Sequence, residues 1–458
     1  MSINAYISNR VVFPTEVRPA AVLVDTDSGL IARIAEADAP GPVDEVHNLQ
    51  DHALLPGLID PHVHINEPGR TEWEGFATAT RAAAAGGITT LIDMPLNCLP
   101  PTTTVAGLAA KRAAAQGKCT VDWRPWGGAE NGNQPHLAEL AQAGVPGFKC
   151  FLVYPGCEGL GLLDEPNLRA ALPIIARTGL PLLVHAENPA TLASVDPTSG
   201  DPRVYATYLA TRPDQAELAA ISLLIALCRE TGAHIHIVHL ATALALPMLR
   251  AAKAEGLPIT LETCPHYLYF AAESIPDGRT DLKCAPPIRS RANRDLLRAA
   301  VLDGTIDLIA SDHSPCPPDM KGLDSGDFLE AWGGIASLSL GLSILATVLG
   351  APCLASETDD EPAQLLAIAH LMSESPAKLA GIAQNKGRIA PGFDADLTVF
   401  APSESFTVTP ADFHFRHPIS PYLGERLLGR VKQTILRGHL IFDQGTFPAA
   451  PIGREVPA

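Results

Sequence analysis

Long apolar runs are missing from this sequence. None approaches the roughly 20 uncharged residues that a helix needs to cross a bilayer. Residues 1–20 also lack the basic start, apolar block and small-residue cleavage site of an export signal. We therefore expect a soluble protein of the cytoplasm.

Positive charge is also scarce, since 33 Lys and Arg face 50 Asp and Glu and leave a net charge of −17. A field of that sign repels nucleic acid and anionic membranes, so neither is an expected partner, and a neutral substrate is slightly favoured. The nine cysteines are scattered, odd in number and without a Cys-x-x-Cys pair. That pattern predicts reduced, buried thiols and neither a disulfide framework nor a structural zinc site.

Short apolar runs alternate with Ala- and Leu-rich stretches through the middle of the chain, which indicates a parallel sheet with helical crossovers. Eight such runs are present, the number that closes a (β/α)8 TIM barrel. The runs are 57–63, 88–93, 119–124, 147–152, 181–185, 234–239, 259–263 and 306–311. Between the first two, Thr71 and Glu74 predict a capping box for a helix that ends at Gly86 and Gly87.

The two ends of the chain differ from this middle part. Residues 1–52 and 386–458 hold short Val- and Ile-rich runs broken by Pro, Asp and Gly, which are typical of strands and turns. The expected fold class is therefore α/β, with a TIM barrel over 53–385 and one small β-sandwich domain built from both chain ends.

Polar residues interrupt the predicted strands near their carboxyl ends, where barrel enzymes place their active sites. His62 and His64 are two apart and so point to the same side of an extended strand, where they could share a metal. Taken alone, such a pair is more typical of packed or exposed histidines than of a metal site. Three further residues occupy the same end of other strands: His185, His239 and Asp312.

Lys149 is flanked by apolar residues in the fourth predicted strand. A desolvated ammonium costs several kcal/mol unless it is paired or loses its charge. Two interpretations stay open: a lysine paired with Asp or Glu, or a lysine carboxylated by carbon dioxide, whose carbamate is an anionic ligand that can bridge two cations.

These residues resemble the amidohydrolase superfamily, in particular its cyclic amidohydrolase branch of dihydroorotases, hydantoinases, dihydropyrimidinases and allantoinases. The resemblance begins with GLIDPHVH at 57–64 and runs nearly end to end. Its other motifs are 66–75 (NEPGRTEWEG), 147–151 (GFKCF), 264–267 (CPHY), 286–289 (PPIR), 311–318 (SDHSPCPP), 330–335 (EAWGGI) and 387–396 (GRIAPGFDAD).

The resemblance implies a binuclear centre of two divalent metal ions, zinc by default, with Co, Mn or Fe as alternatives. It assigns one ion to His62, His64 and Asp312, the second to His185 and His239, and a bridging N6-carboxylysine to Lys149. It also implies hydrolysis by a metal-bridging hydroxide, with Asp312 taking the proton of the water and returning it to the leaving ring nitrogen.

Within the branch, dihydroorotases carry an Arg two residues after the second His, where it pairs with a substrate carboxylate. This chain has Asn66 there, which favours an uncharged ring such as allantoin. Segments 311–321, 330–332 and 420–424 also resemble the allantoinase pattern more than the hydantoinase pattern. Hydantoinases or dihydropyrimidinases are the alternative, and a non-enzymatic scaffold is a third, which the complete ligand set disfavours.

The resemblance further implies a homotetramer and a set of substrate contacts. Tyr154 stands where hydantoinases carry a Tyr that binds the carbonyl oxygen, although an aromatic residue packing over the rim is as good an interpretation. Ala285 departs from the Ser that relatives often have. The expected substrate-binding residues are Asn66, Asn97, Tyr154, Cys284, Arg289 and Gly334.

Overall fold

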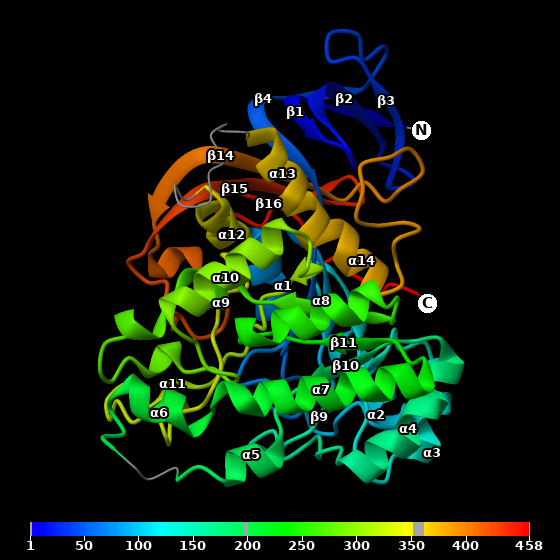
Figure 1. Ribbon diagram of the computed structural model, residues 1–458. Coiled ribbons are helices and arrows are strands. Elements are labelled where there is room, and N and C mark those ends of the chain that lie inside the picture. The colour runs from blue at the N-terminus through cyan, green and yellow to red at the C-terminus, as the bar shows by residue number, and fades with distance from the viewer. Residues whose placement is uncertain (1, 197–199, 351–360, 458) are drawn as a thin grey trace.

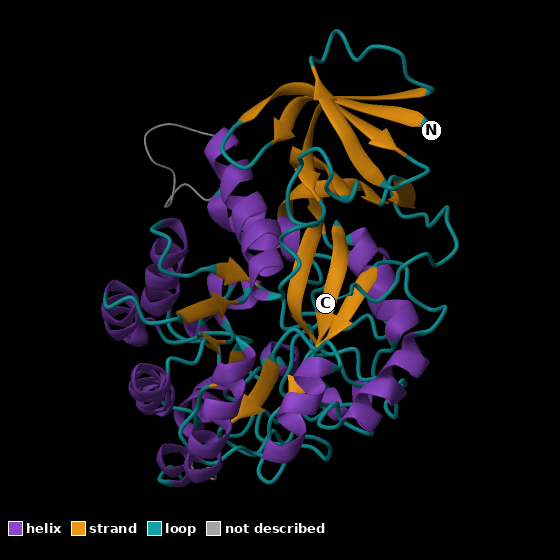
Figure 2. Ribbon diagram, turned by 90° about the vertical axis from the view of Figure 1, so that its right-hand side faces the viewer, coloured by secondary structure: helices purple, strands orange, loops and turns teal. Residues whose placement is uncertain are grey.

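The computed structural model describes residues 2–196, 200–350 and 361–457. Figure 1 shows a sheet from the two chain ends lying over a barrel, with the blue N-terminal strands beside the orange and red C-terminal ones. In Figure 2 helices flank the strands of the barrel. The predicted fold class, a TIM barrel with a small β domain from both chain ends, is confirmed.

The barrel wall consists of a 6-stranded and a 3-stranded parallel group. On one side the two groups are linked through Trp126, whose backbone N–H donates to Asp93 O of β6 at 2.9 Å. On the other side His64 N donates to His313 O at 2.9 Å and closes the cylinder. The strands are β5 (Leu58–Val63), β6 (Ile88–Asp93), β7 (Asp122–Pro125), β8 (Gly127–Gly128), β9 (Phe148–Phe151), β10 (Leu182–His185), β11 (Ile235–Ile237), β12 (Ile259–Thr263) and β13 (Leu308–Ile309).

Each of the eight predicted runs overlaps one of these nine strands, and the two-residue strand β8 was not predicted. Every residue of β5 and β6 is buried, as expected for parallel strands that are covered on both faces.

The chain ends form a 7-stranded sheet in the order β16-β15-β14-β4-β1-β2-β3. The predicted boundary between residues 52 and 53 falls inside β4, and β5 follows after Gly57 alone. A Cβ at Gly57 would lie 2.3 Å from Thr89 Oγ1, so glycine is required where the chain passes from sheet to barrel. The strands are β1 (Ile3–Val12), β2 (Val17–Asp25), β3 (Leu30–Ala35), β4 (Glu45–Pro56), β14 (Leu397–Thr407), β15 (Arg426–Leu436) and β16 (His439–Asp443).

Helix α1 (Phe76–Ala85) ends at Gly86 as predicted, but the capping box at Thr71 and Glu74 is wrong. The residue before the helix is Gly75, which has no capping side chain, and the carboxylate of Glu67 accepts from Phe76 N at 2.9 Å instead. A carboxylate from outside the helix thus replaces the local cap.

The other α-helices are α2 (Val105–Ala115), α3 (Gln134–Gln142), α4 (Glu165–Thr178), α5 (Pro189–Ala193), α6 (Tyr205–Thr211), α7 (Asp214–Thr231), α8 (Leu246–Ala254), α9 (Pro265–Tyr269), α10 (Arg291–Leu302), α11 (Pro318–Lys321), α12 (Gly341–Leu349), α13 (Glu361–Ala369) and α14 (Ser375–Leu379). Among the described residues, none of the helices is both long and apolar enough to cross a membrane. The eight cysteines of the described ranges are all free, and all except the partly exposed Cys157 are buried. The ninth, Cys353, lies outside those ranges.

Candidate active site

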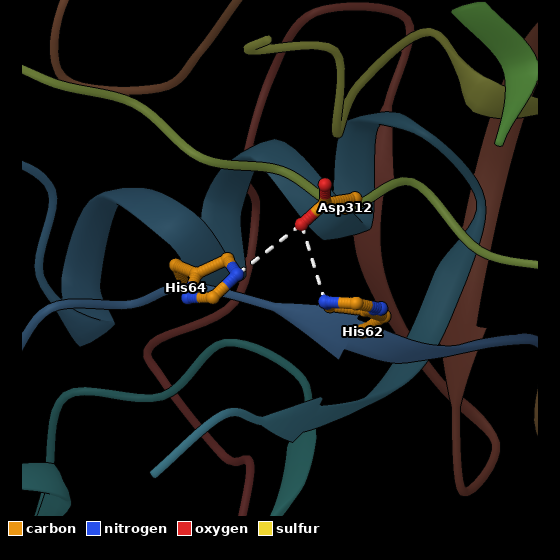
Figure 3. A group of neighbouring side chains, drawn as sticks. All are labelled: His62, His64 and Asp312. Atoms are coloured by element: carbon orange, nitrogen blue, oxygen red, sulfur yellow. Dashed lines mark hydrogen bonds and ion pairs between the residues drawn. The ribbon is translucent and has the colours of Figure 1, made fainter. Parts of the chain in front are cut away.

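His62, in β5, and His64, directly after it, converge on one carboxylate. The Nε2 atoms of both rings lie 3.2 Å from Asp312 Oδ1, and Figure 3 shows the three side chains pointing toward one another. Their ligand atoms all lie within 4.8 Å of one another. Although Asp312 is some 250 positions further along the chain, it belongs to the same cluster because barrel strands end at a common rim.

A second imidazole pair adjoins this cluster. His185 is the last residue of β10 and His239 follows β11. Their Nδ1 and Nε2 atoms, respectively, are 3.0 Å apart, and the ring of His239 is centred 5.4 Å from that of His62. The structure therefore gathers the four histidines and Asp312 at one end of the barrel.

Lys149 lies in β9 with its side chain fully buried. Among the described residues no group accepts a hydrogen bond from its Nζ, so the alternative of a lysine paired with Asp or Glu is not what the structure shows. Burial lowers the pKa of Lys149 to about 8. A buried amine of this kind lacks the partner that its desolvation requires.

This donor set fits divalent cations. Burial is the largest influence on His64, His185 and His239 and lowers the pKa of each ring, which favours the neutral imidazole that binds metals. Nδ1 of His239 is buried without a hydrogen-bond partner, as is the amine of Lys149. Imidazole nitrogens beside a carboxylate and two orphaned nitrogens form a site that a cation pair would satisfy.

Buried carboxylates form hydrogen bonds with two of these imidazole rings, those of His62 and His185. Glu262 of β12 accepts from His62 Nδ1 and from His236 Nε2, and Glu187 lies 2.6 Å from His185 Nε2. Burial alone would raise the pKa of Glu262, but the charge of His62 and the hydrogen bonds from His236 and His62 together outweigh burial and lower the pKa to about 2. Such partners fix the tautomer and orientation of metal-binding imidazoles.

Arg212 in turn pairs with Glu187. Burial would raise the pKa of Glu187, but the charge of Arg212 and the hydrogen bond with His185 together lower it to about 2. Neither acid was identified from the sequence. The signals were present, because Glu262 interrupts an apolar strand and Glu187 stands two residues after His185.

Four residues around the site adopt the left-handed backbone region that favours glycine. The φ angles are 65° for Asn66, 60° for Asn97, 40° for His239 and 47° for Asp312. Non-glycine residues in this conformation are uncommon and cluster at functional sites. The unusual backbone conformations of these four residues therefore mark this end of the barrel as a candidate functional site.

A cavity of about 450 Å³ opens above the clustered side chains. Three of the predicted substrate-binding residues line it: Asn97, Tyr154 and Gly334. Asn97 Nδ2 lies 3.4 Å from His64 Nδ1, whereas Tyr154 is 63% exposed at the opening.

The other three predicted substrate-binding residues do not line this cavity. Asn66 is buried, with Nδ2 3.5 Å from Pro315 O. Arg289 forms a buried ion pair with Glu217 at 2.6 Å. Cys284 stands between two lining residues, and its own carbonyl oxygen accepts from Tyr208. Residues that line the cavity without having been predicted include Arg212, Lys283 and Trp332.

A TIM barrel with histidines, lysine and aspartate at the strand ends defines a metal-dependent hydrolase of the amidohydrolase type. The model of the amidohydrolase family matches residues 53–441, and the chain belongs to this family. It is 48% identical to an allantoinase of Streptomyces avermitilis, over 98% of this chain and 97% of that protein. It is 40% identical to an allantoinase of Saccharomyces cerevisiae, over 100% and 99% of the two chains. The solved L-hydantoinase (dihydropyrimidinase) of Arthrobacter aurescens superposes with a TM-score of 0.90 at 28% identity, and 99% of each chain is covered.

Proposed function

We propose that this chain hydrolyses the ring amide of allantoin and gives the open-chain allantoate. The observation that carries the proposal is the convergence of His62, His64, His185, His239 and Asp312, with the orphaned amine of Lys149, below a single cavity. The similarity to allantoinases over nearly the whole chain supports allantoin as the ring that is opened.

We propose that His62, His64 and Asp312 hold one divalent metal ion, that His185 and His239 hold a second, and that Lys149, carboxylated on Nζ, bridges them. Zinc is the default, and Co, Mn and Fe suit the same ligands. When bound, such a pair of cations lowers the pKa of a water molecule and polarises the amide carbonyl.

Asp312 is the proposed proton carrier. Burial alone would raise the pKa of its carboxyl, but the charge of His62 and a hydrogen bond from His64 outweigh burial and hold the pKa far below its usual range. The carboxylate is therefore ionised and can accept the proton of the attacking water. Transfer of that proton to the ring nitrogen completes ring opening, because an unprotonated ureido nitrogen leaves poorly.

Asn97, Tyr154 and Gly334 are the proposed substrate contacts, since they line the cavity. Asn66 stands at the position where a dihydroorotase has the Arg that recognises a substrate carboxylate. Its neutral amide lies beside Pro315 O, so this position holds no cation and favours an uncharged substrate. Cys284 and Arg289 are proposed to act indirectly: the carbonyl of Cys284 accepts from Tyr208, and Arg289 pairs with Glu217, and both contacts support the cavity.

The direct test is turnover by the metal-loaded enzyme. We expect a kcat/KM for allantoin at least tenfold above the values for plain hydantoin and dihydrouracil, with allantoate identified as the product. A preference for hydantoin or dihydrouracil would refute allantoin as the substrate.

A hydantoinase or dihydropyrimidinase activity is the second candidate. Two observations favour it: the close superposition on the Arthrobacter hydantoinase, and the place of Tyr154 in the cavity wall. If Tyr154 binds the carbonyl oxygen, Tyr154→Phe lowers kcat on every ring alike, whereas a Tyr that only packs at the opening leaves kcat unchanged.

We also propose a homotetramer in the cytoplasm, without nucleic-acid or membrane partners, in which a barrel domain (53–385) carries a β domain from 1–52 and 386–458. Light scattering is expected to give four times the chain mass of 48.2 kDa. A monomer would refute the tetramer.

A further inference from the structure

One wall of the cavity is the loop 329–334, and a buried lysine anchors it from behind. Nζ of Lys321 donates to Gly334 O at 2.5 Å, to Trp332 O at 3.0 Å and to Lys283 O at 3.3 Å. An ammonium has three donors, so these carbonyls occupy all of them. Lys321 therefore holds the wall in place and has no hydrogen bond left to give a ligand.

Lys283 holds the same loop but is differently placed. Its Nζ donates to Ala331 O at 2.5 Å and to Leu329 O at 3.1 Å, and the side chain itself lines the cavity. Two of its three donors are thus used by these loop carbonyls. One N–H of Lys283 is available to an acceptor in the cavity.

The surroundings of Lys283 keep this donor effective. The side chain is 9% exposed, and its Nζ lies 5.1 Å from the centre of the Tyr208 ring. Burial, with smaller contributions from Lys321 and Arg212, lowers the pKa of Lys283 to about 8, while Asp327 opposes the shift. Because this pKa lies above 7, the amine is still charged at neutral pH. A charged donor that is largely shielded from water binds a carbonyl oxygen strongly.

Arg212 also lines the cavity, but its positive charge is paired with the buried carboxylate of Glu187, to which Nε and Nη2 donate. We propose that Lys283 is a specificity-determining residue, whose remaining N–H binds the carbonyl oxygen of an open-chain arm carried by the cyclic amide. In allantoin that arm is the ureido group, so this assignment rests on the proposed function. An unsubstituted ring has no such oxygen and gains nothing from Lys283.

The test compares two rings that differ in the arm. For Lys283→Met we expect kcat/KM for allantoin to fall about 10- to 100-fold more than kcat/KM for plain hydantoin, the range for one hydrogen bond to a charged group, because the loss on hydantoin reports only the broken loop contacts. Lys283→Arg should restore part of the loss because it returns a charged donor. An equal loss on both rings in Lys283→Met would overturn the assignment.

Two further variants separate ligand binding from support of the loop. Lys321→Met breaks hydrogen bonds to the carbonyls of the same wall, but Lys321 has no donor left for a ligand. The kcat/KM values for allantoin and hydantoin should therefore fall by the same factor. Lys253→Met is the matched control, because Lys253 also bonds a backbone carbonyl, Thr305 O at 2.7 Å, but does not line the cavity. For Lys253→Met we expect no change of kcat/KM on either ring. The metal content should be the same in all variants.

Failure of the proposed function would be distinguishable. If the wild type opens hydantoin but not allantoin, allantoin is refuted as the substrate, and the same comparison is made between hydantoin and a hydantoin with a carboxamide arm. If neither ring is opened, calorimetric binding replaces turnover. In each case the subsite is supported if Lys283→Met loses turnover or affinity mainly for the ring that carries the arm. An equal loss for rings with and without the arm overturns it.

Discussion

At the scale of single residues, the cluster of four histidines and Asp312 could be predicted from the sequence because each member lies at or just after the carboxyl end of a recognisable apolar strand. Their supporting partners could not. Glu262 bonds a histidine 200 positions away, and Arg289 is occupied by Glu217, 72 positions away. Spacing along the chain says nothing about such pairs, since they depend on how the barrel closes.

Lys149 gives the sharpest prediction at this scale. Lys149→Ala removes the proposed bridging ligand, so we expect loss of most bound metal and of activity by at least about 100-fold. Metal analysis and allantoin turnover check this, with partial recovery expected on addition of short carboxylates. Full activity with a full complement of metal in the variant would rule out a bridging role.

The pKa of Lys149 also predicts how the metal-free protein recovers. Carbon dioxide reacts with the neutral amine, and a pKa lowered to about 8 means that the neutral fraction rises as pH increases toward 8 and then levels off. At a fixed concentration of dissolved carbon dioxide and metal, activity should therefore return several-fold faster at pH 8 than at pH 7. Recovery at the same rate at both values would contradict carboxylation of this amine.

At the scale of elements, apolar runs located eight of the nine barrel strands and missed only the two-residue β8, whereas local signals were less reliable. The capping box failed because a carboxylate from the preceding loop, Glu67, takes over the start of α1. β13 is only two residues long because it pairs with β12 at two positions, Glu262 with Leu308 and Thr263 with Ile309. Strand length thus depends on a neighbour that the sequence does not identify.

The cavity wall offers a matched pair of glycines for a test at this scale. A Cβ at Gly334 would lie 2.4 Å from Ser314 O, whereas at Gly333 the nearest atoms are 4.0 Å away. Gly334→Ala should therefore displace the wall, destabilise the fold by about 1–3 kcal/mol and lower kcat/KM. Gly333→Ala should leave the melting temperature nearly unchanged. Equal melting temperatures of the two variants would show that the wall accommodates the added Cβ at residue 334 without cost, contrary to this expectation.

At the scale of the whole molecule, the joining of the two chain ends in one sheet was predictable from their shared strand character. The way this sheet is fixed to the barrel was not. Lys386 lies within 3.0 Å of three carboxylates, Asp122 of β7 and the sheet-side Asp394 and Asp396. The ammonium neutralises a buried acidic cluster at the junction of the two parts.

Lys386→Met should therefore destabilise the protein strongly, by about 3–5 kcal/mol, because it leaves Asp394 and Asp396 without their cation, while Asp122 keeps Arg437. Denaturant unfolding of the metal-loaded protein measures this. Lys378→Met is the control, since Lys378 is 53% exposed and its surface pair with Glu374 is worth about 0–1 kcal/mol. Similar midpoints for the two variants would show that the cluster does not stabilise the junction.

The pair of cations between the strand ends is the claim on which the proposed chemistry depends. Anomalous diffraction from crystals of the metal-loaded protein tests it most directly. Two peaks per chain are expected, one among His62, His64 and Asp312 and one between His185 and His239, with density for a carboxyl group on Lys149 Nζ. A single peak or none, beside an unmodified Lys149 amine, would contradict the account.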